Sequence, residues 1–178
     1  MYFKPAEENA PTGGAAAMME DGVFSHYQPD AILAQHVWPD LPVGTFGILE
    51  GPMMGNSDRF TITIKGSGGH ASMPHQTNDA IIAAGQMIAL LQTIVSRNVN
   101  PLDSAVVTIG ELHAGERYNV IAGKAVLEGT VRTFSPKVKD QVKKRMTEII
   151  CGLEEVFNLT IDMEYLDGYP ATVNDGNG

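Results

Sequence analysis

The chain carries two adjacent carboxylates near its start, Glu7 and Glu8, within the segment Phe3-Lys4-Pro5-Ala6-Glu7-Glu8. Neighbouring negative charges repel each other, so a site that contains both needs a nearby cation or a shared proton. A hydrolytic metal site uses one carboxylate as a metal ligand and a second one to move protons for the attacking water. A solvated acidic pair is the alternative interpretation, and the sequence leaves both open.

A histidine is placed to join these carboxylates. His36 follows the short apolar run at residues 31–34. If that run is a strand beside the one that precedes the carboxylates, His36 and Glu8 can converge on one metal. Enzyme zinc sites take three protein ligands plus water, so these two residues are too few by themselves. A structural role for a lone histidine is the alternative.

The loop from Gly66 to His75 is the most specific segment, because it has three glycines within four residues and two histidines. Glycine allows the backbone to approach a ligand closely. His70 can then donate a hydrogen bond to an oxyanion from a mobile loop. The alternative is a glycine-rich turn with two surface histidines.

Two further candidates lie later in the chain. Arg132 stands in the run at residues 126–134, which otherwise alternates toward a core, and a guanidinium there suits a bidentate grip on a substrate carboxylate. A surface ion pair would explain it equally. Asn119, in the segment Arg117-Tyr118-Asn119-Val120-Ile121, is the second candidate.

Composition narrows the classes of partner. The 178 residues include 12 basic and 21 acidic side chains, for a net charge of −9. This argues against a nucleic-acid or an anionic-membrane surface, which would need clustered Lys and Arg. No apolar run approaches the ~18 residues of a membrane span. The first residues lack the pattern of a signal peptide, so a cytoplasmic location is expected.

The chain has one cysteine, Cys151, which excludes an intrachain disulfide and a cysteine metal cluster within it. The apolar neighbours Ile149, Ile150 and Leu153 predict that this thiol is buried and structural.

Residues 1–55 have short elements that suggest part of an α/β layer. Residues 1–3 resemble the end of a strand, residues 15–20 a short helix that Gly22 stops, and residues 31–34 and 43–49 short strands. So few strands cannot bury both faces of a parallel sheet, which predicts a piece of a larger domain.

Residues 56–168 have the pattern of a complete ferredoxin-like unit, βαββαβ, with an antiparallel four-stranded sheet and two helices on one face. Alternation predicts the first strand, and spacings of three and four predict the helices. The expected strands are residues 59–65, 105–112, 126–134 and 159–166, and the expected helices are residues 79–97, with Asn78 as cap, and a second one starting at Ser135-Pro136.

Taken in order, these segments resemble those of the metal-dependent amidohydrolases, a family that includes hippurate hydrolase, N-acyl-amino-acid amidohydrolases (aminoacylases), auxin-conjugate hydrolases and related carboxypeptidases. The resemblance rests on five segments: Phe3–Glu8 followed by Gly13-Gly14-Ala15, Gln35–Gly44, Gly66–His75, Asn119-Val120-Ile121 and Gly129–Phe134. Lys4, where the family usually has Gln, and Ala122, where it usually has Pro, depart from the pattern.

The resemblance implies a role for each candidate. Glu7 would be the general base and acid, and Glu8 and His36 would be metal ligands. His70 would stabilise the oxyanion from the lid domain of a second subunit. Asn119 and Arg132 would bind the substrate around its carboxylate. The cofactor would be a two-metal centre of zinc, or of manganese, cobalt or nickel.

The resemblance also implies that the site is incomplete here. The family's "C-G-H-D-x-H" and "G-S-E-D-F" segments, which supply further ligands, do not occur in the chain. We therefore expect an internal fragment, inactive alone, with a partial catalytic domain at residues 1–55, a lid or dimerisation domain at 56–168 and a return segment at 169–178. The parent reaction would be hydrolysis of N-acyl amino acids or small peptides in a homodimer, with no nucleic acid or membrane partner. The alternative is a non-catalytic dimerisation or binding module.

Overall fold

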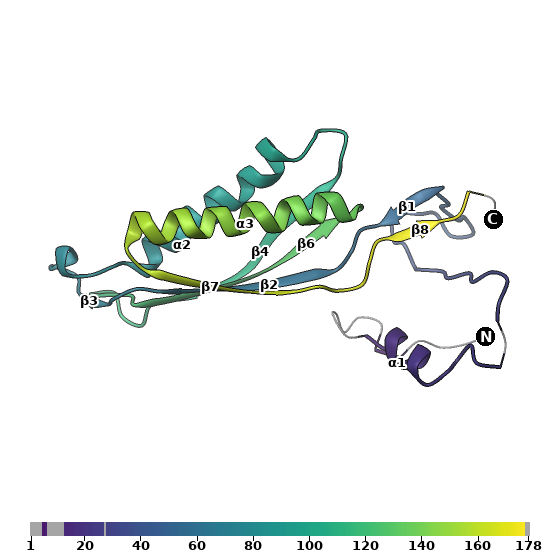
Figure 1. Ribbon diagram of the computed structural model, residues 1–178, viewed down its shortest axis with the longest axis horizontal. Helices are drawn as coiled ribbons and strands as arrows, with labels where there is room; N and C mark the ends of the chain where they lie inside the picture. The colour runs from purple at the N-terminus through teal and green to yellow at the C-terminus, as the bar shows by residue number, and fades with distance from the viewer. Residues whose placement is uncertain (1–4, 7–12, 27, 177–178) are drawn as a thin grey trace.

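The computed structural model describes residues 5–6, 13–26 and 28–176. Its main body is a four-stranded antiparallel sheet covered on one face by two helices (Figure 1). This confirms the predicted ferredoxin-like architecture. In sheet order the strands are β4 (Ala105–Ala114), β6 (Lys124–Thr133), β2 (Asp58–Lys65) and β7 (Thr160–Leu166), and the helices are α2 (Ala80–Thr93) and α3 (Pro136–Phe157).

Alternation along the strands separates the two faces of the sheet. In β2, Phe60, Ile62 and Ile64 are fully buried beneath the helices, whereas Arg59 and Lys65 are exposed on the opposite face. Both helices contribute one apolar stripe to the same core. The buried helix residues are Ala80, Ala83, Ala84, Met87 and Leu91 of α2, and Val138, Val142, Met146, Ile149, Ile150 and Leu153 of α3.

Polar caps begin both helices. The side chain of Ser135 accepts a hydrogen bond from the amide of Val138, and Pro136 occupies the first turn of α3, as predicted. For α2 the cap is Asp79, whose carboxylate accepts from the amides of Ile81 and Ile82, and the expectation of Asn78 as cap was wrong by one residue. Asn78 instead donates through Nδ2 to the carbonyl of Asn158 at 2.6 Å.

The helical segment Ala80–Asn98, α2 with the π-helical turn Ile94–Asn98, is apolar on more than its inner side. It has 19 residues, and an 18-residue stretch within it has a mean hydropathy of 1.4, which by length and composition suffices to cross a membrane. One side packs on the sheet, so the segment is a core helix of this fold. The other side exposes Ile81, Ile82 and Leu90 to solvent.

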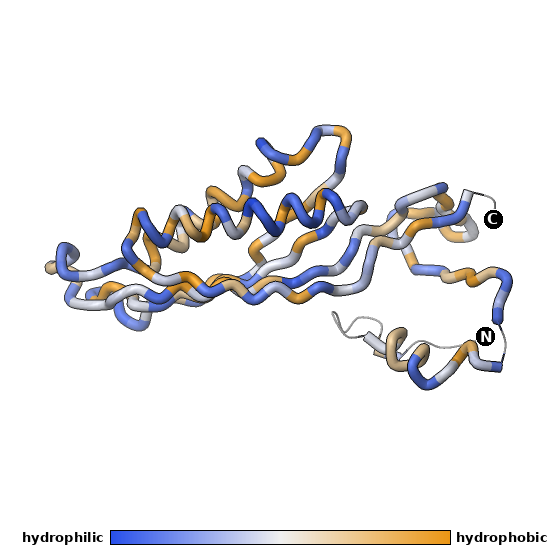
Figure 2. The backbone as a smooth tube through the Cα atoms, viewed as in Figure 1, coloured by the Kyte–Doolittle hydropathy of each residue, from blue (hydrophilic) through white to orange (hydrophobic). Residues whose placement is uncertain are grey.

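The N-terminal region matches its prediction in part. The helix α1 (Ala15–Glu20) forms as expected. Residues 31–34 and 43–49 are not strands, because an apolar run becomes a strand only when another strand pairs with it, and these segments pair with none among the described residues. The side chains of Leu33, Val43 and Ile48 stay exposed. Figure 2 shows hydrophobic stretches, coloured orange, on the backbone between α1 and β1. The strand end expected at residues 1–3 lies outside the described residues.

Two features of the rest of the chain were also missed. Cys151 is exposed, so the prediction of a buried thiol was wrong. It lies between the buried Ile150 and Leu153 in sequence, but the helical rotation of about 100° per residue places it on the outer face of α3.

The short strands β1 (Gly51–Met54) and β8 (Thr172–Asn174) pair antiparallel and were not predicted. They carry the chain away from the sheet at one end (Figure 1).

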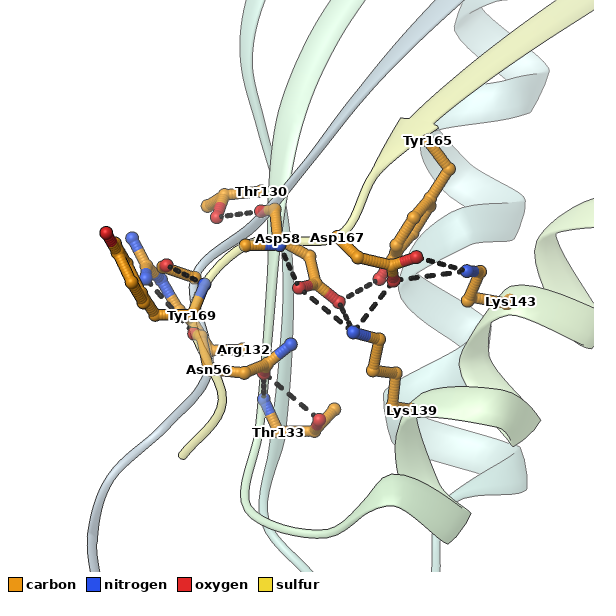
Figure 3. A network of polar contacts seen from close by, with 12 residues as sticks. Asn56, Asp58, Thr130, Arg132, Thr133, Lys139, Lys143, Tyr165, Asp167 and Tyr169 are labelled. Carbon is orange, nitrogen blue, oxygen red and sulfur yellow. Dashed lines mark hydrogen bonds and ion pairs between the residues drawn. The ribbon is translucent and has the colours of Figure 1, made fainter. Parts of the chain in front are cut away.

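A buried carboxylate joins the sheet to α3 at that end (Figure 3). Asp58 has no exposed side-chain surface and forms an ion pair with Lys139 at 3.0 Å. Its oxygens also accept from the hydroxyl of Tyr165 at 2.8 Å and from the amide of Gly168 at 2.9 Å. Lys139 continues to Asp167 at 2.7 Å. Asp58 therefore ties together the start of β2, the end of β7 and the first turns of α3.

The Asp58 network predicts a large loss of stability on neutralising this carboxylate. In Asp58→Asn the partly buried Lys139 loses one of its two anions, so the free energy of unfolding should fall by about 3 kcal/mol. Asp162→Asn is the matched control, because its ion pair with Lys65 is exposed and worth less than about 1 kcal/mol. Urea unfolding of both variants measures the difference, and equal losses would contradict the anchoring role.

The same network predicts a loss of stability at alkaline pH. Burial and the hydrogen bond to Asp58 raise the pKa of Tyr165. Burial opposes the charged form of Lys139, but the hydrogen bonds of Lys139 to Asp167 and Asp58 and the charges of these carboxylates raise its pKa overall. Above about pH 10 the unfolded chain loses protons that the folded chain retains, so stability falls as pH rises.

Tyr165→Phe removes one of these two groups, so its stability should decline less steeply than that of the wild type between about pH 9 and pH 11. Tyr118→Phe is the control, because Tyr118 is fully exposed, and it should follow the wild-type curve. Urea midpoints across this pH range test the slope, and parallel curves for Tyr165→Phe and wild type would count against it.

Candidate functional site

The strand that carries His70, β3, lies at the end of the sheet opposite β1 and β8 (Figure 1), and Asn119 lies beside it. His70 belongs to β3 (Gly69–His70), which pairs with β5 (Val120–Ile121) so that His70 faces Val120. The amide of Ala71 donates to the carbonyl of Asn119 at 3.1 Å. We call this end, formed by residues 66–76 and 115–121, the tip.

The glycines of the tip are required by contacts inside the chain. A Cβ at Gly66 would lie 2.1 Å from the carbonyl oxygen of Asn78, and one at Gly68 would lie 2.7 Å from that of Ile121. Neither clash can be relieved without moving backbone. The glycine loop was expected to allow close approach to a ligand, whereas in the fold Gly66 and Gly68 allow close packing that holds His70 in place.

Ser72 fixes the tautomer of the neutral His70 ring. Its backbone amide donates to Nδ1 of His70 at 3.2 Å, and its hydroxyl lies 2.7 Å from the same atom. A nitrogen that accepts from an N–H carries no proton, so the neutral ring of His70 bears its proton on Nε2. That proton is available for donation to an oxyanion. Sequence reasoning missed Ser72, although a serine two residues after the histidine was the available signal.

His36 has the opposite arrangement. Its Nδ1 lies 2.6 Å from the carbonyl of Val37, and because a carbonyl can only accept, Nδ1 carries the proton. The ring also contacts Trp38 edge-on, with 6.2 Å between the centroids. The lone pair of Nε2 is thus the free one, which is the form in which metal-binding histidines are usually held by a backbone carbonyl.

Arg132 lies far from His70 and Asn119 of the same chain. It sits near the end of β6 beside the Asp58 network and donates through Nη1 to the carbonyl of Asn56 at 3.1 Å. β6 begins at Lys124, next to the tip, so the eight steps to Arg132 span about 27 Å at 3.3–3.4 Å per residue. We call the end of the sheet that holds Arg132 the base. The structure therefore pairs two predicted site residues and separates the third.

The predicted metal and proton-transfer residues are not brought together in the described part of the chain. Glu7 and Glu8 lie outside the described residues, and His36 is exposed. Within residues 5–6, 13–26 and 28–176, no three His, Cys, Asp or Glu side chains gather closely enough to hold a metal ion.

Known proteins share both the fold and these segments. The peptidase dimerisation domain, M20_dimer, matches residues 55–153. This chain belongs to the M20 peptidase dimerisation domain family. Its matched part includes the sheet strands β2, β4 and β6, the helix α2 and the tip.

Curated relatives of this M20 chain include bacterial deacetylases. N-acetyldiaminopimelate deacetylase of Anoxybacillus flavithermus is 47% identical over 173 residues, which is 97% of this chain and 45% of that protein. N-acetyl-L-cysteine deacetylase of Bacillus subtilis is 44% identical over 98% of this chain and 41% of its own length. The chain thus spans less than half the length of these relatives.

Two solved structures share the arrangement. A crystal structure from methicillin-resistant Staphylococcus aureus matches 98% of this M20 chain and 44% of its own, with a TM-score of 0.85 and 37% identity. The Bacillus subtilis YXEP protein, described as a dinuclear metal-binding peptidase of the M20 family, matches 98% of this chain and 42% of its own, with a TM-score of 0.74 and 37% identity.

The hydrogen bonds of the two histidines predict opposite tautomers. In the neutral state, His70 should carry its proton on Nε2 and His36 on Nδ1. Long-range proton–nitrogen NMR correlations of the chain at high pH distinguish the two forms directly. His113, exposed and beside Glu111, serves as the reference surface histidine. The same tautomer at His70 and His36 would contradict the assignment.

Proposed function

We propose that this chain is part of a metal-dependent amidohydrolase that hydrolyses the amide bond of small N-acyl amino acids in a homodimer. The observation that carries the proposal is the placement of His70 and Asn119 at one end of the lid and Arg132 at the other, on a fold shared with M20 enzymes. Residues 1–55 and 169–178 would belong to the catalytic domain and residues 56–168 to the lid.

Each residue has one task in this proposal. The guanidinium of Arg132 binds the carboxylate that every N-acyl amino acid carries, whether N-acetyldiaminopimelate or a hippurate-like compound. Asn119 adds a hydrogen bond beside it. Nε2–H of His70 donates to the oxyanion that forms when water adds to the amide carbon. Glu7 takes a proton from that water and passes it to the leaving nitrogen.

Glu8 and His36 would hold a divalent metal. The tautomer of His36, with Nδ1 donating to Val37 and Nε2 free, fits this task. When bound, such an ion polarises the amide carbonyl and lowers the pKa of water, and zinc or manganese, cobalt or nickel suits the mixed imidazole and carboxylate donors. The dinuclear metal centre of the YXEP protein supports this assignment by similarity.

The dimer would form along the β4 edge of the sheet. Among the described residues β4 pairs only with β6, so its outer backbone groups are free to pair with another strand. Val106 and Leu112 of β4 are exposed, and α2 exposes Ile81 close above the end of that strand, near Gly115. The opposite edge, β7, instead exposes Asp162 in an ion pair with Lys65.

Pairing β4 with β4 of a second copy makes the copies antiparallel across a two-fold axis. The tip of each copy then lies beside the base of the other. A small substrate cannot span the ~27 Å between Arg132 and the tip of one chain. It can contact Arg132 of one copy and His70 and Asn119 of the other, so each active site contains residues of both copies.

A non-catalytic dimerisation module is the second candidate, and one observation favours it: residues 56–166 contain the whole four-stranded sheet and its core. Such a module would dimerise without hydrolysing any acyl amino acid, even when joined to a complete catalytic domain.

A chimera tests the catalytic proposal. In this chimera, the chain replaces the equivalent segment of the Anoxybacillus deacetylase, to which it is 47% identical over 173 residues. The chimera should hydrolyse N-acetyldiaminopimelate and the isolated chain should not. His70→Ala should lower kcat by about 10²–10³-fold, as expected for loss of one oxyanion donor. An inactive chimera that folds and binds metal would support the module instead.

Mixed dimers then locate the site. A dimer of one His70→Ala copy and one Arg132→Ala copy has one site with both residues intact if the site is shared. Random mixing of the two inactive chimeras should restore about a quarter of the activity, because half the dimers are mixed and half their sites are intact. No recovery would show that His70 and Arg132 act within one copy, against the proposal.

A further inference from the structure

A groove lies at the base, beside Arg132. It runs between the π-helical turn, the connection at residues 99–104 and the start of β4, with a volume of about 470 Å³. A second hollow of about 350 Å³ adjoins it and shares Asp103, Ser104 and Phe134. The groove is mostly apolar, and its charged lining residues are Asp103 and Arg132; its apolar walls include Val95, Val99, Pro101, Val106 and Phe134.

At the other end of β4 a loop projects into solvent. β4 ends at Ala114, and Gly115, at φ +77°, turns the chain toward β5. Tyr118 in this loop is fully exposed, which is unusual for an aromatic side chain of this size. Arg117 precedes it and is also exposed. Within the described part of the chain, neither Arg117 nor Asp103 of the groove has an ion-pair partner.

We infer that the loop at residues 115–118 of a second copy docks in this groove, with Tyr118 as its anchor and Arg117 paired with Asp103. The inference rests on the proposed dimer and specifies which surfaces set its geometry. A chain cannot fill its own groove, because the ten residues of β4 separate loop and groove by about 30 Å.

Strand geometry brings the two surfaces together. If β4 pairs with β4 of a second copy over its full length, Ala105 of one copy faces Ala114 of the other. The loop that follows Ala114 then runs beside the residues that precede Ala105, which form the wall of the groove. Because β4 lies between the docked loop and β6, on which Arg132 pairs with Val106, the loop lies about two strand spacings, ~9.6 Å, from the strand that carries Arg132.

The size and charge of the loop at residues 115–118 match the groove. A buried tyrosine removes roughly 150–250 Å² from water, and tyrosines and arginines in apolar pockets are the usual centres of binding energy in interfaces. The positive Arg117 would meet Asp103, the acidic one of the two charged residues that line the groove. Asn119 directly follows the docked residue, so docking also delivers Asn119 and the neighbouring His70 to the base of the other copy.

Charge reversal tests the docking in the chain itself. Arg117→Glu and Asp103→Arg should each raise the dimer dissociation constant about tenfold, and the double variant should return to within about threefold of wild type, because the pair is restored in reverse. Tyr118→Ala should weaken the dimer by about 30-fold or more. Lys144→Glu, an exposed reversal on α3 away from β4, is the control and should leave the constant unchanged. Sedimentation equilibrium of the wild type and the five variants measures these constants.

Cross-linking gives an independent readout of position. In a Cys151→Ser background, which removes the exposed native thiol, a Ser104→Cys chain mixed with a Glu116→Cys chain, which keeps Tyr118, should form a disulfide between copies on mild oxidation. The control mixture, Ser104→Cys with Lys144→Cys, should not.

The outcomes separate this inference from the proposed function. A wild-type dimer that tolerates both charge reversals and forms no cross-link overturns the docking, while dimerisation stands. A wild-type chain that stays monomeric at about 100 μM overturns both docking and dimer. Charge rescue and cross-linking without recovery of activity in mixed chimeras establish the docking and remove the shared active site.

Discussion

The buried carboxylate of Asp58 is the constraint on which the base of the sheet depends. It is fully enclosed and holds a lysine from α3, a tyrosine from β7 and the amide of Gly168. A buried carboxylate without such partners would be strongly unfavourable, so the three elements must meet at this point. Arg132 lies in the adjoining strand and is held to the carbonyl of Asn56, two residues before Asp58. The position of the proposed substrate anchor thus follows from the packing of a charge.

The length of the sheet then determines how a site can be assembled. His70 is fixed at the tip by glycines that permit close backbone packing, and Arg132 is fixed at the base. Antiparallel strands of ten residues keep these ends about 30 Å apart and are too rigid to bring them together. In the proposed dimer, a two-fold axis perpendicular to β4 would bring tip and base together without bending the sheet. The same dimer would cover the exposed apolar residues of α2 and the β4 edge.

The sequence predicted the helices and strands that depend on residues close together in the chain. Alternation in β2 and the serine–proline start of α3 located those elements, because each depends on residues close in the chain. It failed where the outcome depends on distant segments. Gly51 of β1 pairs with Asn174 of β8, 123 positions later, and residues 31–34 find no strand partner in the described part of the chain. Cys151 was predicted to be buried because its neighbours in the sequence are apolar, but the rotation of about 100° per residue along α3 places it on the exposed face. In the candidate site, the glycine-rich loop at residues 66–75 was sufficient to predict His70. The hydrogen bond from Ser72 that sets the tautomer of His70 depends on the folded loop and was not predicted.

Docking of residues 115–118 would solve a problem that strand pairing leaves open. An edge strand can pair with its copy in several registers, and a slip of two residues keeps the same side chains on each face. Such a slip would move the tip of one copy by about 6.6 Å along the base of the other. Misplacement of a catalytic group by even 1 Å can cost 10²-fold in rate. A tyrosine seated in one groove, with Arg117 opposite Asp103, would select a single register, so the docked loop would contribute precision to the site as well as affinity to the dimer.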